Sequence, residues 1–238
     1  MLRKIGVIGD VHAEDVHLEQ AITTLLRHDA EILVCTGDIT DGPGNLARCV
    51  ELLTDYDVAT VRGNHDRWVL QHKARHIPHA HMLDELDPDV VQFLKNLPIS
   101  LTLDTAVGQL LLCHSVADND LQKVWPGTER MPAERSERLD QIIADNRYRW
   151  MINGHVHYRT IIHFEQMPLT IAGTLMNRHR PGFSLLDLDE HTITGFEFAE
   201  ATTPQVVKQQ PLLPDHETDI FRDTSHFRGD WAPKTLYA

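Results

Sequence analysis

Five short stretches of this sequence place side chains that could bind a metal directly after an apolar run. They are GDVH, GD, GNHD, CHS and GHVH, and they carry Asp10, His12, Asp38, Asn64, His65, Asp66, His114, His155 and His157. A single Asp after a strand is more often a helix cap or a turn residue, and a single His is more often structural. The prediction of a site therefore depends on all five stretches occurring together.

The types of these side chains indicate which metals they would suit. Carboxylate, imidazole and amide groups without a thiolate favour Mn²⁺, Fe or Zn²⁺ in a reactive site over a structural zinc site. They are too many for one tetrahedral ion, whereas two ions that share a carboxylate would accommodate them. Such two-metal sites hold the attacking and leaving oxygens of a phosphoryl displacement. The candidate ligands are Asp10, His12, Asp38, Asn64, His114, His155 and His157.

The elements that would position the first three stretches alternate between strand and helix. Apolar runs predict strands over residues 5–8, 31–35 and 58–61, and helical spacing of apolar residues predicts helices over 14–27 and 45–53. This order favours parallel strands joined by crossover helices. Ligands of such sheets bind at the carboxyl ends of the strands, where the polar stretches fall.

The second half of the chain indicates a second, mixed sheet. A helix is expected over 89–97, a hairpin over 101–103 and 109–112, a helix over 136–146, and strands before Gly154 and over 161–163, 169–172, 183–188 and 192–198. From residue 202 the sequence is rich in proline and polar residues and has no clear period. We expect an extended tail there, packed on the body through Phe221, Phe227 and Trp231.

Composition narrows the class of partner. The 238 residues include 22 basic and 35 acidic residues, a formal charge of −13. This balance argues against stable nucleic-acid or membrane-surface binding, because both favour clustered Lys and Arg. It still allows a small phosphorylated substrate, because bound metal can reverse the local field. Three cysteines without C-x-x-C spacing, and no apparent leader or span, predict a cytoplasmic protein.

The order and spacing of the five stretches resemble the motif series of the calcineurin-like metallophosphoesterases, and TIAGTLMNRHRPGFSLLDL is similar to the closing segment of small bacterial phosphodiesterases. The resemblance covers residues 1–200 and leaves 201–238 as the tail. It implies an α/β fold, a four-layer α/β/β/α sandwich of two mixed sheets flanked by helices. It also implies two divalent ions, with Mn²⁺ expected and Fe, Zn²⁺, Ni²⁺ or Mg²⁺ as alternatives.

The resemblance also implies a role for each residue. Asp10, His12 and His157 would hold the first ion, Asn64, His114 and His155 the second, and Asp38 would bridge them. A hydroxide shared by the ions would be the in-line nucleophile. His65 would stabilise the transition state or protonate the leaving oxygen, paired with Asp10 or Asp66. The sequence departs from the family pattern at Ala13, where glycine is common, and at Cys113 before His114.

Several residues outside the motifs could contact a substrate. Among Arg62, Arg67, Asn177, Arg178 and Arg180, ordinary surface exposure is the favoured reading for each, and Asn177 and Arg178 are the best candidates for substrate binding. The segment HKARHIPHAH could be a third metal site or a lid, but a polar surface loop is favoured over both.

The expected function is hydrolysis of phosphoesters in small substrates, by a phosphodiesterase or a phosphatase of broad range. A phosphomonoesterase or a dinucleoside polyphosphate hydrolase is the alternative within that class. A metal-binding scaffold without catalysis is the alternative outside it. The physiological substrate, the native metal and the oligomeric state stay open at this point.

Overall fold

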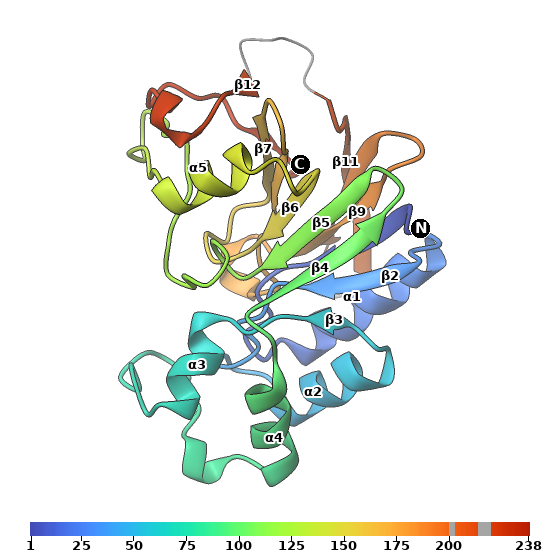
Figure 1. The fold of residues 1–238 in the computed structure, drawn as a ribbon. Coiled ribbons are helices and arrows are strands. Elements are labelled where there is room, and N and C mark those ends of the chain that lie inside the picture. Colours follow the sequence, from blue (N-terminus) through green and yellow to red (C-terminus); the bar gives the residue numbers. More distant parts are fainter. Residues whose placement is uncertain (200–202, 214–219) are drawn as a thin grey trace.

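The computed structural model describes residues 1–199, 203–213 and 220–238. Two β-sheets face each other, and helices cover the outer face of each (Figure 1). Both sheets contain parallel and antiparallel pairs. The predicted four-layer sandwich of two mixed sheets flanked by helices is thereby confirmed.

The first sheet has the strand order β11-β10-β9-β1-β2-β3. Its parallel half comprises β1 (Lys4–Ile8), β2 (Ile32–Cys35) and β3 (Ala59–Thr60), and its antiparallel half comprises β9 (Gly182–Asp187), β10 (Thr192–Ala199) and β11 (Thr203–Pro211). The strand–helix–strand order predicted for the first sixty residues is confirmed. The parallel arrangement brings the ends of β1, β2 and β3 to one edge.

The second sheet has the order β12-β7-β8-β6-β5-β4, with β13 paired to β7. Its strands are β4 (Ser100–Thr105), β5 (Gly108–Cys113), β6 (Trp150–Asn153), β7 (Thr160–Phe164), β8 (Leu169–Ile171), β12 (Ile220–Phe221) and β13 (Lys234–Thr235). The hairpin predicted on either side of Gly108 is present as β4 and β5. Since β5 and β6 are parallel, His114 and the GHVH stretch leave the sheet on the same side.

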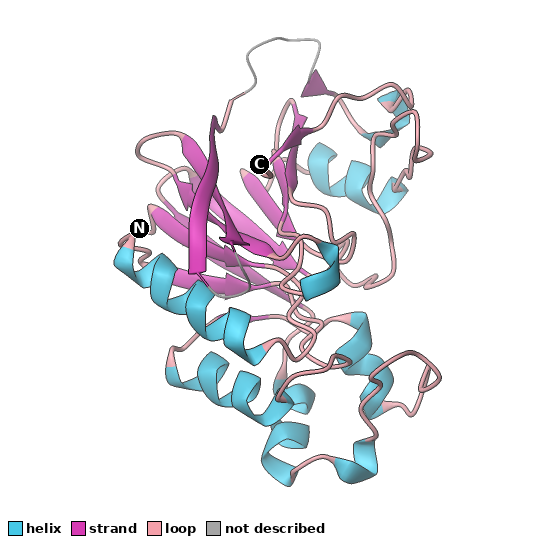
Figure 2. Ribbon diagram, turned by 180° about the vertical axis from the view of Figure 1, so that it is seen from behind, coloured by secondary structure: helices cyan, strands magenta, loops and turns pink. Residues whose placement is uncertain are grey.

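Helices occupy both outer layers. On the first sheet lie α1 (Asp15–Arg27) and α2 (Leu46–Asp55), as Figure 2 shows from behind, with α4 (Pro88–Asn96) beside α2 and α3 (Asn64–Leu70) beside α4. The outer face of the second sheet is covered by α5 (Glu137–Ala144). Short 3-10 turns, η1 (Leu83–Glu85), η2 (Asn177–His179) and η4 (Thr224–His226), lie in the connections. No helix in the described ranges has the length and apolar character needed to span a bilayer.

The alternation of side chains along the strands builds three apolar layers. In β5, Leu110 and Leu112 face the space between the sheets, while Leu111 faces α5. Val7 of β1 joins the layer between the sheets, and Ile8 joins the layer under α1 and α2. Because both sides of each central strand are covered, the strand ends are held firmly and can position polar residues.

Two regions differ from the expected elements. Residues 64–70 form α3, where no helix was predicted. Residues 203–211 form β11, an edge strand that pairs with β10 where we expected an extended tail without a clear period. Edge strands need only one partner and one packed face, so a Gln-rich and Lys-containing strand with prolines near its ends is tolerated there.

Residues 220–238 pack on the second sheet. Phe227 is fully buried, and its ring lies 5.9 Å from that of Phe164 and 4.9 Å from that of Phe221. Trp231 contacts Trp125 with ring centroids 5.1 Å apart. The predicted boundary at residue 200 falls outside the described residues, so the division into 1–200 and 201–238 stays a prediction.

Candidate metal centre

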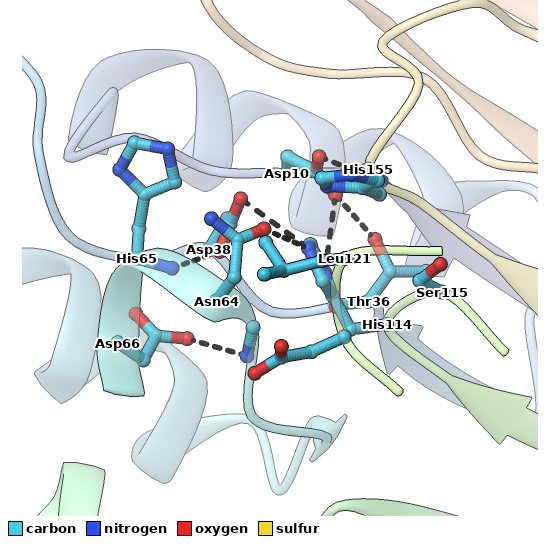
Figure 3. A network of polar contacts seen from close by, with 12 residues as sticks. Asp10, Thr36, Asp38, Asn64, His65, Asp66, His114, Ser115, Leu121 and His155 are labelled. Atoms are coloured by element: carbon cyan, nitrogen blue, oxygen red, sulfur yellow. Dashed lines mark hydrogen bonds and ion pairs between the residues drawn. The ribbon is translucent and has the colours of Figure 1, made fainter. Parts of the chain in front are cut away.

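The exits of five strands from both sheets meet at one place. Two groups of potential ligands lie there, each with its ligand atoms within 4.8 Å of one another: Asp10, His12, Asp38 and His157 form one, and Asp38, His114 and His155 form the other. Asp38 belongs to both groups. The Asn64 Oδ1 atom lies 3.0 Å from His114 Nε2, which places the amide at the second group (Figure 3). All seven predicted ligands are therefore brought together.

Distances within the first group fit a metal ion. His157 Nε2 lies 3.1 Å from His12 Nε2 and 3.1 Å from Asp10 Oδ2. Two nitrogen ligands at about 2.0–2.1 Å from a tetrahedral ion lie roughly 3.3 Å apart. In the second group, His114 Nε2 lies 3.4 Å from Asp38 Oδ2. The donor atoms thus face one another at the spacing that a shared ion requires.

The charges of the site also fit a cation. Asp10 and Asp38 are buried, and burial together with the charge of Asp10 raises the pKa of Asp38 well above its ordinary value. Burial alone would raise the pKa of Asp10 as well, but His114 and His157 lower it below the ordinary range. A divalent ion would compensate the two crowded carboxylates, because metal binding stabilises their ionised form.

Two histidines of the site, His12 and His155, are held in the form that binds metals. Burial and the neighbouring His157 lower the pKa of His12 to about 3, and burial and His114 lower the pKa of His155 to about 4. Both rings are therefore neutral near pH 7, and a neutral imidazole nitrogen offers its lone pair to a metal.

Contacts on the far side of each ring fix its orientation. His12 Nδ1 donates toward the carbonyl oxygens of Thr40 and Asp41, each at 3.1 Å, and His114 Nδ1 donates to Thr36 O at 2.8 Å. Both rings thus turn Nε2 into the site, an arrangement common to metal-ligating histidines. His157 Nδ1 lies 2.9 Å from His179 Nδ1. His179 was not predicted from the sequence. The one feature that could have indicated it is the presence of a further histidine in the closing segment.

Glycines in the motifs let backbone approach the carboxylates. A Cβ atom on Gly63 would collide with Asp38, and one on Gly154 would collide with Asp10 and Thr36. His155 N donates to Asp10 Oδ2 at 2.9 Å, and His65 N donates to Asp38 Oδ1 at 2.8 Å. Gly63 before Asn64 and Gly154 before His155 therefore each have a steric reason.

Ala13 occupies the left-handed region, with φ of 56°. That conformation explains why glycine is common at this place in the family motif. The Ala13 methyl group is fully buried and belongs to the apolar layer under α1. Burial of the methyl group offsets part of the backbone strain, since removing a CH₂-sized group from water contributes about 0.8 kcal/mol.

His65 is paired with a residue that the sequence reasoning did not select. Its Nδ1 lies 2.8 Å from Asp41 Oδ2, whereas pairing with Asp10 or Asp66 was expected and was wrong. Asp41 is buried, and although burial would raise its pKa, hydrogen bonds from His65 and Arg75 lower it to about 2. Burial would lower the pKa of His65, but Asp41 raises it above its ordinary value. The feature of the sequence that could have indicated Asp41 is its place as the second aspartate of the GDITD stretch.

The buried carboxylate of Asp66 is used by the backbone. It accepts from Ile39 N at 2.8 Å, from Thr40 N at 3.1 Å and from Gly63 N at 2.9 Å. Figure 3 shows its carboxylate pointing away from the His65 ring. Asp66, predicted as catalytic, makes the contacts of a positioning residue that ties the loop after β2 to the start of α3.

The His-rich loop folds over Asp41. Arg75 binds the two carboxylate oxygens of Asp41 at 2.7 and 2.9 Å, and His81 N donates to Asp41 Oδ1 at 2.9 Å. In the described ranges, neither group of potential metal ligands includes a histidine of this loop. The loop, read from sequence as surface, therefore helps to hold the partner of His65.

Asn177 and Arg178, predicted to bind substrate, are exposed residues of η2. Asn177 N donates to Glu14 Oε1 at 3.0 Å, and Arg178 Nε lies 3.2 Å from Met176 Sδ. Both line a cavity of about 120 Å³ together with Asp41 and His79. Asn177 and Arg178 thus lie near Asp41, the partner of His65. Their role in substrate binding stays a prediction.

Known proteins resemble this chain in fold and sequence. A stretch of 66 residues is 35% identical to the uncharacterised protein MJ0912 of Methanocaldococcus jannaschii, and it covers 28% of this chain and 27% of that protein. The structure of the hypothetical protein PH1004 from Pyrococcus horikoshii matches with a TM-score of 0.62 and 14% identity over 81% of this chain and 87% of that one. A metallophosphoesterase from Sphaerobacter thermophilus matches with a TM-score of 0.57 and 18% identity over 84% and 89%.

The sequence model of the calcineurin-like phosphoesterase superfamily domain matches residues 3–191. This range contains all five motif stretches and both groups of potential ligands. The chain therefore belongs to the calcineurin-like phosphoesterase superfamily.

Proposed function

We propose that the protein is a metal-dependent phosphoester hydrolase with two divalent ions. The observation that carries this proposal is the position of Asp38 in both groups of potential ligands. Asp10, His12 and His157 would hold one ion, and Asn64, His114 and His155 the other, with Asp38 shared. When bound, divalent ions lower the pKa of water and stabilise the negative charge that develops during phosphoryl transfer.

His65 is the residue proposed to act on the leaving oxygen. Its backbone N–H is bonded to Asp38, and its ring lies 4.9 Å from that of His12, so the imidazole stands beside the proposed ions. Asp41 engages Nδ1 and fixes the ring plane. Nε2 is then the atom that could donate a proton to the departing alcohol or stabilise its charge.

Small phosphorylated molecules are the proposed substrates, with Mn²⁺ the proposed ion. The net charge of −13 disfavours a polymeric nucleic acid, while two cations at the strand ends would still attract one phosphoester group. Phosphodiesters are the preferred class. Phosphomonoesters or dinucleoside polyphosphates are the alternative class. These substrates differ from phosphodiesters in the charge on the phosphoryl group that is transferred.

The test is turnover of bis-p-nitrophenyl phosphate and p-nitrophenyl phosphate by metal-stripped protein reloaded with Mn²⁺, Fe²⁺, Zn²⁺, Ni²⁺ or Mg²⁺. We expect metal-dependent release of nitrophenol and about two ions per chain by elemental analysis. Folded protein that turns over neither substrate with any of these ions would contradict the proposed activity and favour a scaffold.

The shared carboxylate is tested separately with Asp38→Ala. Loss of both ions is expected, because each ion loses a charged ligand. The exposed Asp84 supplies the matched control, Asp84→Ala, which should keep its metal. Two ions retained in Asp38→Ala would refute the shared role and leave the hydrolase proposal to the turnover assay.

A further inference from the structure

A cavity of about 300 Å³ opens beside His114, on a different side of the site from Asn177 and Arg178. Arg62, Arg67 and Ile99 line it on one side, and residues 117–120 line it on the other, with His114 at its inner end. Ligand pockets for small molecules begin at roughly this volume. The cavity thus adjoins the proposed second ion and is large enough for part of a substrate.

Its walls are braced before any ligand arrives. Arg67 Nε and Nη2 donate to the two oxygens of Asp120 at 2.6 and 2.7 Å, which joins α3 to the loop after β5. That loop is closed by Val116 N to Asn119 O at 3.1 Å, with Asn119 N to Val116 O at 2.9 Å. Arg62 N donates to Pro98 O at 2.8 Å and fixes the backbone next to Ile99. A preformed wall binds without an ordering cost.

Two arginines and two aspartates line the cavity, and among the described residues Arg62 is the one of these four without an ion pair. Arg67 forms an ion pair with Asp120, on which the charge of Arg62 also acts, and Asp118 pairs with Arg138 at 3.5 Å. In the part of the chain that the structure describes, the Arg62 guanidinium takes part in no hydrogen bond or ion pair, and it is half-buried. A half-buried guanidinium with five free donors favours a carboxylate or phosphate partner. Ile99, with 43% of its surface exposed, offers an apolar contact beside it.

We propose that this cavity receives the leaving group of the substrate and that Arg62 selects leaving groups that carry a second anionic substituent. This inference rests on the proposed function. The scissile phosphoryl group would lie at the ions, and its ester oxygen would direct the leaving alcohol past His114 toward Ile99 and Arg62. The substrate class is then a phosphoester whose alcohol bears a carboxylate or a further phosphate.

A matched pair of substrates tests the proposal. The leaving group of 3-carboxy-4-nitrophenyl phosphate differs from that of 4-nitrophenyl phosphate by one carboxylate. We expect kcat/KM to be about tenfold higher for the carboxylated substrate, as one charge-assisted hydrogen bond would supply. In Arg62→Met the ratio should fall to about one, while Arg62→Lys should keep part of it. Arg27→Met, an exposed arginine on α1, is the control and should keep the full ratio.

A binding measurement separates this proposal from the proposed function. Calorimetry should show that 5-hydroxy-2-nitrobenzoate, the carboxylated product, binds more tightly than 4-nitrophenol, and that Arg62→Met removes the difference. A protein without turnover that keeps this Arg62-dependent binding refutes the hydrolase and retains the cavity. A protein that hydrolyses both substrates with a ratio near one, unchanged by Arg62→Met, overturns the cavity proposal alone.

Discussion

His65 and Asp41 share a hydrogen bond of 2.8 Å, and Arg75 donates hydrogen bonds to both oxygens of the same carboxylate. Three segments distant in sequence therefore meet at one buried acid: the loop after β2, the first turn of α3 and the His-rich loop. The imidazole next to the proposed metal ions is thus oriented by a charge that does not itself belong to either ligand group.

Replacing His65 by Ala should keep the metal and lose rate. The ring is absent from both ligand groups, whereas proton transfer to a leaving group typically contributes 10²–10⁴-fold. Elemental analysis and kcat on bis-p-nitrophenyl phosphate measure the two effects. Asp41→Asn should lower kcat in the same direction, and the double variant should be little worse than His65→Ala, because the two residues act as a unit. Full additivity would contradict the coupling.

Arg75→Ala should lower kcat by about tenfold and leave KM nearly unchanged. The guanidinium touches Asp41 and no proposed ligand, so its loss should disorder the His65 ring without removing a substrate contact. Arg75→Lys should recover only part of the rate, because an ammonium cannot reproduce the two parallel hydrogen bonds. If Arg75→Ala lowered the melting temperature but left kcat unchanged, the contact of the His-rich loop with Asp41 would serve stability alone and would not position His65.

Ala13→Gly should leave the free energy of unfolding within about 1 kcal/mol of the parent. Relief of the left-handed backbone, about 1–2 kcal/mol, is offset by the buried methyl group and the added freedom of the unfolded chain. Ala13→Val should instead cost about 3 kcal/mol or more, because a β-branched residue at positive φ adds strain in a filled space. Urea unfolding measures both, and equal stability of the two variants would refute this balance.

Gly154→Ala should lower metal content. The added methyl group would meet the carboxylate of Asp10 and the side chain of Thr36, so the carboxylate must move. Gly229→Ala is the control: it places a Cβ in open space at a φ of 90° and should cost stability alone. Metal counted by elemental analysis in both variants decides the matter, and an unchanged count in Gly154→Ala would show that the site tolerates the displacement.

The elements and the metal-binding candidates could be predicted because their signals are local. Strands such as Ile32–Cys35 are continuous apolar runs, and the groups that follow them are set by the direction of the chain. Asp41 could not be selected in the same way. Its carboxylate reaches His65, 24 residues further along the chain, in a loop where Asp38 and Asp41 adopt positive φ of 46° and 67°, a conformation that the sequence does not reveal.

Other features that the sequence did not indicate also depend on distant partners. Asp66 follows the GNH sequence, and the backbone N–H groups of Ile39 and Thr40, 27 and 26 residues earlier in the chain, both donate to its Oδ1, while its catalytic role stays a prediction. His179 is one of sixteen histidines, and only the approach of η2 to the GHVH loop distinguishes it. Strand β11 shows no alternation because it needs one neighbour only. In each case the decisive contact is made by a segment that no local pattern identifies.

The candidate ligands are divided between the two sheets. Asp10, Asp38 and Asn64 follow strands of the first sheet, and His114, His155 and His157 follow strands of the second. Ions bound among them would therefore cross-link the two halves of the sandwich at one end. Because such ions bind the folded chain and not the unfolded one, their affinity adds directly to the free energy of unfolding. The melting temperature would then rise with free metal concentration, and chelation would leave the apolar layer between the sheets to hold the two halves together.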